Sequence, residues 1–172
     1  MSTRVDARRH DVAFSVLGGP TTVVDLGGRR FLIDPTFDEP GPHDYLKKLV
    51  GPAIPADALG PVDVVLVSHD NHPDNFDDEG RRVALAAPLV LTNPGAAGRL
   101  GPPAVGLKPF DTFQLPAEDD AKAMTVHAVP AVHGPADGVR DADGHVNCEV
   151  TGFVLSGEIG RASCRERVSS VV

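Results

Sequence analysis

Val67-Ser68-His69-Asp70-Asn71-His72-Pro73-Asp74-Asn75-Phe76-Asp77 is the most informative stretch of this chain. It follows residues 61–67, whose nearly continuous apolar run is typical of a strand covered on both faces. It leads into residues 77–87, which have a helix-like composition. Loops at the ends of buried strands often carry functional sites, because a rigid scaffold holds them in place. We therefore look for the chemistry of the protein in this loop.

Residues 69–77 contain two His, three Asp and two Asn. Imidazole and carboxylate groups suit a borderline divalent ion such as Zn²⁺, with Mn²⁺ or Fe as alternatives. The other interpretation is a polar turn whose Asp and Asn side chains cap the following helix. Capping accounts for Asp74, Asn75 or Asp77, but it does not account for the two histidines beside them. The loop therefore predicts a metal site.

Three further segments extend this pattern along the chain. They are Gly18-Gly-Pro-Thr21, Phe31-Leu-Ile-Asp-Pro35 and Val129-Pro-Ala-Val-His-Gly134. With these segments in this order, residues 11–157 resemble the metallo-β-lactamase superfamily, and in particular its bacterial branch of ascorbate-phosphate lactonase-like hydrolases. The resemblance implies an α/β (α+β) protein, namely the N-terminal part of a four-layer αββα sandwich built from two similar halves.

The resemblance also implies a set of metal ligands. The candidates are His69, Asp70, His72, Asp74, Asn75 and His133. Either Asp70 takes the first ligand position of the family motif, or His69 does and one extra residue intervenes. In both registers Asn75 stands where the family has a histidine. A neutral amide is a poorer ligand than imidazole, so one metal is an alternative to two.

The implied activity is metal-assisted hydrolysis of a small ester, lactone or phosphoester. Asp74 is the candidate catalytic residue, which would ligate metal and orient the attacking water or relay its proton. Asp34 and Asp77 would orient the ligands through hydrogen bonds. Asp34 could equally be a turn residue before Pro35, and Asp77 a helix cap. The alternative function is a non-catalytic binding protein of the same fold, which the Asn at position 75 favours.

Composition excludes several other functions. Asp and Glu outnumber Lys and Arg by 24 to 16, and the net charge of −8 argues against a duplex nucleic-acid binder. Apolar runs fall short of the roughly 20 residues of a membrane span, and the N-terminus lacks the apolar core of a secretory signal. We expect a cytoplasmic protein with a small-molecule substrate, of open oligomeric state. Cys148 and Cys164 are too few for a disulfide framework, and Cys148 lacks a visible basic partner that would make it a nucleophile.

The hydrophobic pattern predicts strands followed by alternating strands and helices, which indicates a mixed sheet with helices on its outer face. Strands are expected at 12–17, 21–26, 29–34, 61–67, 89–92, 104–108, 112–115, 124–129 and 149–155. Helical structure is expected at 44–50 and 77–87, with a helical turn at 96–100.

The last fifteen residues, 158–172, differ from the rest. They lack strand alternation and a helical face, and they resemble a translated short-read sequencing adapter. We therefore expect residues 1–157 to form an incomplete domain and 158–172 to be a non-native tail. The parent protein would be the enzyme and this chain an inactive fragment. Its exposed apolar sheet surface should favour self-association.

Overall fold

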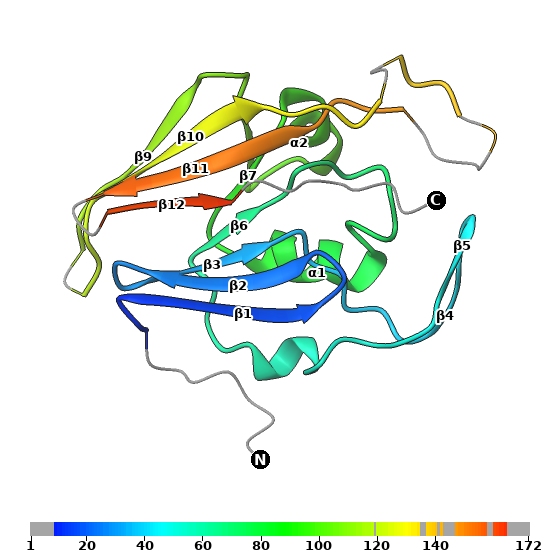
Figure 1. Ribbon diagram of the computed structural model, residues 1–172, viewed down its shortest axis with the longest axis horizontal. Coiled ribbons are helices and arrows are strands. Elements are labelled where there is room, and N and C mark those ends of the chain that lie inside the picture. The colour runs from blue at the N-terminus through cyan, green and yellow to red at the C-terminus, as the bar shows by residue number, and fades with distance from the viewer. Residues whose placement is uncertain are drawn as a thin grey trace.

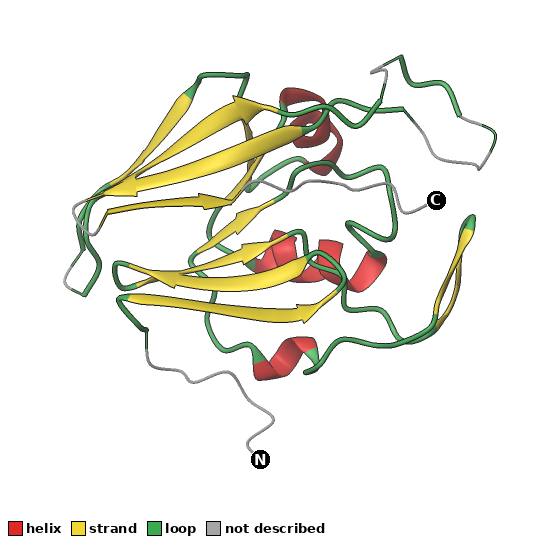
Figure 2. Ribbon diagram, in the orientation of Figure 1, coloured by secondary structure: helices red, strands yellow, loops and turns green. Residues whose placement is uncertain are grey.

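Two β-sheets packed face to face form the centre of the molecule (Figure 1, Figure 2). The computed structural model describes residues 9–118, 120–134, 137–140, 142, 147–157 and 160–164, the last five without side chains. Among these residues, no helix has the length and apolar character needed to cross a membrane.

The first sheet has six strands in the order β1-β2-β3-β6-β7-β8. Their bounds are β1 (Val12–Gly18), β2 (Thr21–Leu26), β3 (Arg29–Ile33), β6 (Val64–Leu66), β7 (Val90–Thr92) and β8 (Ala104–Gly106). The first three strands pair antiparallel, and β3, β6, β7 and β8 pair parallel. Because α1 and α2 connect the parallel strands, the loops after β6 and β7 emerge at the same edge of the sheet.

The second sheet is antiparallel, in the order β12-β11-β10-β9. Its strands are β9 (Thr112–Leu115), β10 (Met124–Pro130), β11 (Thr151–Gly157) and β12 (Gly160–Cys164). Alternate residues of β10 are buried, and Met124, Val126 and Ala128 pack against Phe31, Leu66 and other residues of the first sheet. This alternation is the pattern of a strand with one face on a core.

Helical segments cover the other face of the first sheet. They are α1 (Asp78–Ala86), α2 (Pro94–Leu100) and the 3₁₀ turn η1 (Ala56–Ala58). Strand β6 serves both cores, because Val64 and Leu66 face the second sheet while Val65 packs with Ala84 of α1. The predicted mixed sheet with helices on its outer face is therefore confirmed.

The segment at 41–48 differs from the predicted helix at 44–50. It is a hairpin of β4 (Gly41–His43) and β5 (Leu46–Lys48). Asp44 has a φ of 47°, and a two-residue turn with positive φ is the connection that joins twisted strands. This local turn overrides the helix-like composition of the segment.

Two other elements also depart from expectation. Helix α2 is longer than the predicted turn, because Asn93 caps it by accepting a hydrogen bond from the Ala96 N–H (2.8 Å) and Pro94 suits its first turn. Strand β12 pairs with β11 where no strand was expected. The open edge of β11 offers backbone groups that can pair without a side-chain pattern. Residues 158, 159 and 165–172 lie outside the described part, so the non-native origin of the tail stays a prediction.

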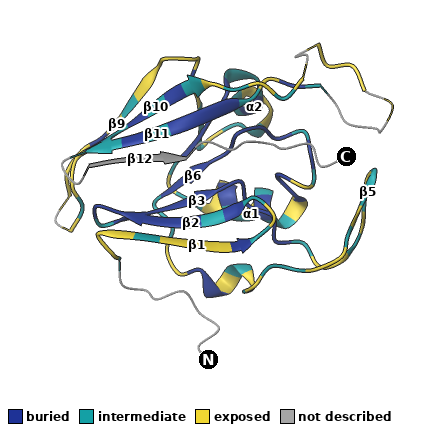
Figure 3. Ribbon diagram, viewed as in Figure 1, coloured by how far each residue is buried: buried dark blue, intermediate teal, exposed yellow. Residues whose placement is uncertain are grey.

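Strand β1 leaves apolar side chains uncovered on the face that points toward the second sheet (Figure 3). Phe14 pairs with Val24 and is 59% exposed, whereas Val24 is 2% exposed and belongs to the core between the sheets. Val12 and Val16, on the same face of β1, are exposed as well. The second sheet therefore covers only part of the first.

Candidate metal centre

Three histidines from two distant segments converge on one point. His69 and His72 lie in the loop after β6, and His133 follows β10. His72 Nδ1 lies 3.0 Å from His69 Nε2 and 3.1 Å from His133 Nε2. His69 and His72 are buried and His133 is half-buried. We call His69, His72 and His133 the imidazole cluster.

The imidazole cluster fits a divalent cation. Two nitrogens bound at 2.0–2.1 Å to one tetrahedral zinc ion lie about 3.3 Å apart, close to the two separations measured from His72 Nδ1. Burial, together with the neighbouring His72 and His133, lowers the pKa of His69 to about 3. His69 therefore keeps the neutral form that metal binding requires at physiological pH.

Buried polar groups fix the ring of His69 from the side opposite the cluster. Ser68 Oγ lies 2.9 Å from His69 Nδ1, so Nε2 is left facing His72. Asp34, directly after β3, accepts a hydrogen bond from the Ser68 N–H at 2.7 Å. Asp34 thus orients the loop through a hydrogen bond, and it does so from a φ of 40°. The ligand geometry depends on this contact between the ends of two adjacent strands.

Asn75 lies on that same supporting side. Its amide nitrogen donates to the His69 carbonyl at 3.0 Å, to Asp34 Oδ1 at 3.2 Å and to Ser68 Oγ at 3.3 Å. These contacts hold the loop together from the Nδ1 side of His69. The structure therefore places the amide nitrogen of this candidate ligand away from the imidazole cluster.

The carboxylate of Asp70 is bound by Arg99 of α2. Arg99 Nη2 lies 2.6 Å from Asp70 Oδ1, and Arg99 Nε lies 3.0 Å from Oδ2. The hydrogen bond to Asp70 raises the pKa of Arg99. The positive charge of the guanidinium balances the negative charge of this buried carboxylate. The partner of Asp70 is therefore Arg99, which lies outside the imidazole cluster. It is the His69 ring that contacts His72, with Asp70 and Asn71 between these two histidines in the sequence.

Asp77 caps helix α1 and binds two other segments, the loop after β3 and the β4–β5 hairpin. Its Oδ1 accepts hydrogen bonds from the Gly80 N–H (2.8 Å) and the Phe37 N–H (2.9 Å). Its Oδ2 accepts from Lys48 Nζ at 3.0 Å, which ties the hairpin to α1. A Cβ at Gly80 would overlap the Pro35 carbonyl, so this glycine permits the close approach of α1 to the end of β3.

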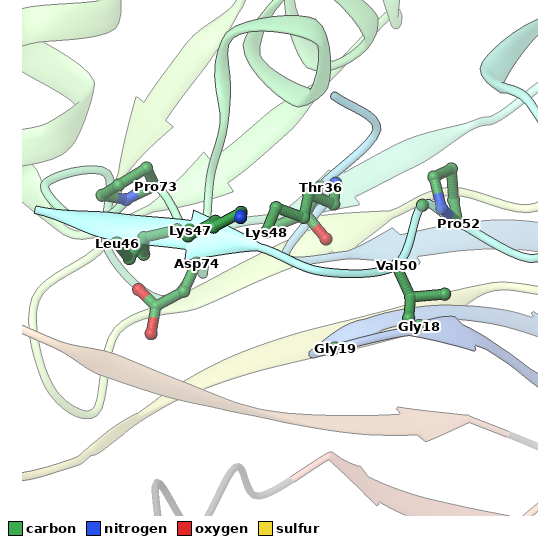
Figure 4. Close-up of a pocket in the computed structure, with 11 residues that line it drawn as sticks. Gly18, Gly19, Thr36, Leu46, Lys47, Lys48, Val50, Pro52, Pro73 and Asp74 are labelled. Carbon is green, nitrogen blue, oxygen red and sulfur yellow. The ribbon is translucent and has the colours of Figure 1, made fainter. Parts of the chain in front are cut away.

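Asp74 is exposed and borders a pocket of about 410 Å³ (Figure 4). The pocket lies between the β1–β2 turn, the β4–β5 hairpin and the loop after β6, with Gly19, Leu46 and Pro73 among its walls. Tyr45, which the sequence analysis missed, contacts His72 of the imidazole cluster and lies near Asp74 of the pocket wall. Its ring is edge-on to His72, with centroids 6.4 Å apart. Burial, with the nearby Asp74 and Asp44 carboxylates, raises the Tyr45 pKa.

Cys148 is the second residue that the sequence analysis missed. Its Sγ and one ring nitrogen each of His69 and His72 lie within 4.8 Å of one another. Burial, and then the charge of Asp70, raises the pKa of the metal-free Cys148 thiol to about 11, although Arg99 opposes this effect. Only the tertiary fold brings Cys148 to this place, so no local pattern could have indicated it.

Other described histidines lie elsewhere. His127 Nε2 contacts Ser156 Oγ at 2.8 Å on the second sheet, and His43 pairs with Asp38 in the β4 region. His145 lies outside the described residues.

Comparison with known proteins finds similarity in structure alone. No protein-family model matches the chain, and no curated protein matches it. A possible metal-dependent hydrolase from Veillonella parvula DSM 2008 is similar over 84% of this chain, with a TM-score of 0.60 and 17% identity. The isothiocyanate hydrolase from Delia radicum gut bacteria is similar over 84%, with a TM-score of 0.57 and 22% identity.

A third similar structure is Igni18, a metallo hydrolase from the archaeon Ignicoccus hospitalis KIN4/I, which matches over 86% of this chain with a TM-score of 0.50 and 20% identity. The chain spans 58% of the length of the first two proteins and 56% of the third. Such identities establish the fold alone. The chain therefore shares the fold of these metal-dependent hydrolases over the part of their length that it spans.

Proposed function

We propose that this chain is the metal-binding part of a metal-dependent hydrolase that acts on a small ester, lactone or phosphoester. The observation that carries the proposal is the close approach of three imidazoles, two of them in a loop whose next residues, Pro73 and Asp74, line a pocket. The likeness to structures described as metal-dependent hydrolases supports it.

His69, His72 and His133 would hold one divalent cation, which we propose to be Zn²⁺, with Mn²⁺ or Fe as alternatives. When bound, such a cation polarises the scissile carbonyl or phosphoryl oxygen and lowers the pKa of a water toward about 7. The pairing of the Asp70 carboxylate with Arg99 favours one ion over two in this part of the fold.

The chain's own residues would supply positioning and proton transfer. Ser68 and Asp34 keep the His69 ring in the orientation that presents Nε2. We propose that Asp74 accepts a proton, which its exposed carboxylate at the pocket and its position two residues after His72 support. Tyr45, between His72 and Asp74, would form the wall of the reaction site.

The net charge of −8 supports a small-molecule substrate over a nucleic acid, and we propose a cytoplasmic location for the parent protein. A non-catalytic binding protein is the second candidate. It is favoured by Asn75, whose amide supports the loop at a position where the family has a metal ligand.

Metal analysis after equilibrium dialysis against Zn²⁺ tests the proposal. We expect near-stoichiometric zinc in the unaltered chain and in His43→Ala, a control outside the cluster. His69→Ala should weaken zinc binding by at least about 100-fold, since the loss of a ligand exceeds the 10- to 100-fold effects of supporting residues. Equal zinc binding by His69→Ala and His43→Ala would refute the proposed site.

Turnover of chromogenic esters, lactones and phosphoesters separates the two candidate functions. It should be measured on this chain and on the longest product of its gene. Turnover that Asp74→Asn lowers without loss of zinc supports the hydrolase. Zinc binding without turnover in either protein supports the binding protein.

A further inference from the structure

Cys148 approaches the imidazole cluster from a different part of the chain. The residue precedes β11 and is 8% exposed. Its sulfur and one ring nitrogen each of His69 and His72 lie within 4.8 Å of one another. In a tetrahedral zinc site with a Zn–S bond of 2.3 Å, sulfur and nitrogen lie about 3.6 Å apart, so a small shift of the thiol would complete the geometry.

The backbone around Cys148 is tied directly to the metal loop. Asn93 Nδ2 donates to the Ser68 carbonyl at 3.2 Å and to the Glu149 carbonyl at 3.0 Å. The Thr151 N–H donates to the same Ser68 carbonyl at 3.1 Å. These three hydrogen bonds, two of them from Asn93, therefore fix the segment after Cys148 against the residue before His69. These backbone contacts hold the Cys148 segment, and with it the sulfur, close to the imidazole cluster.

We propose that Cys148 is a thiolate ligand of the cation held by the imidazole cluster. The inference rests on the proposed function. On binding, the thiol releases its proton to solvent and the sulfur forms a bond to the cation, with no change of oxidation state. A mixed imidazole and thiolate site selects Zn²⁺, Co²⁺ or Fe over Mn²⁺, since a thiolate is a soft ligand.

Absorption spectroscopy of the Co²⁺-loaded full chain tests the proposal. Tetrahedral Co²⁺ gives visible bands from any ligand set, and a thiolate ligand adds a charge-transfer band in the near ultraviolet. Cys164→Ser is the matched control, because it leaves Cys148 as the sole cysteine. We expect the charge-transfer band in the unaltered chain and in Cys164→Ser. Cys148→Ser should keep the visible bands, lose the charge-transfer band and bind Zn²⁺ at least tenfold more weakly.

Each other outcome has a distinct meaning. Visible bands without the charge-transfer band in Cys164→Ser would overturn the thiolate ligand and leave the proposed function standing. A charge-transfer band that persists in Cys148→Ser would overturn the assignment to this residue. No cobalt bands in any variant would overturn the proposed function and the inference together. Because Cys164→Ser alone assigns the band, the test does not depend on the folding of Cys148→Ser.

Discussion

Strands β1 and β6 belong to the same sheet and face the same second sheet, yet they are buried to opposite extents (Figure 3). Leu66 on β6 is fully buried between the sheets, whereas Phe14 on β1 is 59% exposed. The imidazole cluster lies at the end of the covered part. The three imidazoles can be held together there because packing on both faces fixes the backbone that supports them.

The largest change in the free energy of unfolding is expected for a substitution on the buried strand β6. Leu66→Ala should lower the free energy of unfolding by about 3 kcal/mol, since it opens a cavity in a closed core. Urea denaturation measures the change. Leu49→Ala, at a site that is 78% exposed, is the control and should alter stability by less than about 0.5 kcal/mol. A similar loss of unfolding free energy in Leu66→Ala and Leu49→Ala would contradict the difference in burial between the two sites.

The support of the metal loop should have the next largest effect. Asp34→Ala should cost about 2 kcal/mol, because the buried Ser68 N–H then lacks its acceptor. It should also weaken zinc binding roughly tenfold by releasing the His69 ring. Asp57→Ala, at an exposed site in η1, is the control for both measurements. Unchanged stability in Asp34→Ala would mean that the loop does not depend on this contact.

Low pH should destabilise the folded metal-free chain through protonation of His69. Its pKa in the folded metal-free chain is about 3, against an ordinary value of 6.5, so the unfolded chain binds more protons between these values. The free energy of unfolding should therefore fall as the pH drops below 6.5, by at most about 1.4 kcal/mol per pH unit. Urea denaturation at pH 7, 6 and 5 measures the slope, and His69→Asn should flatten it. An equal slope in His69→Asn would assign the effect to other groups.

The smallest effect on stability is expected at β1. Phe14→Thr should change the free energy of unfolding by less than about 0.5 kcal/mol, because the side chain is largely exposed. It should reduce self-association, which sedimentation velocity measures, because it removes exposed apolar surface. A monodisperse unaltered chain would count against the predicted association. Val24→Thr, in the paired buried position on β2, should by contrast destabilise the fold.

The contrast also marks what the sequence could predict. Hydrophobic periodicity located the strands of the first sheet, strands β9, β10 and β11 of the second, and the helix after the metal loop, because burial on one or both faces leaves a local pattern. The hairpin at 41–48 was missed, since its conformation depends on the positive φ of Asp44. Strand β12 was missed because its pairing depends on the open edge of β11.

The site could be predicted only in part for a similar reason. The residue types of the loop at 69–77 indicated a metal, and the structure brings His133 to it. Whether Asp70 faces the metal depends on Arg99, which lies on a separate helix. Cys148 gives no local signal at all, since the hydrogen bonds of Asn93 bring its segment to the loop. Contacts between segments distant in the sequence determine both the pairing of Asp70 and the position of Cys148.

The placement of the imidazole cluster has a consequence for the order of folding. His69 and His72 follow a strand of the first sheet, and His133 follows a strand of the second. A cation held by all three would therefore link the two sheets. All three imidazoles can hold the ion only when the two sheets are docked, because the two ligand segments lie 61 residues apart in the sequence. Complete coordination of the ion would then coincide with the docking of the sheets during folding, and the loss of a ligand with their separation during unfolding.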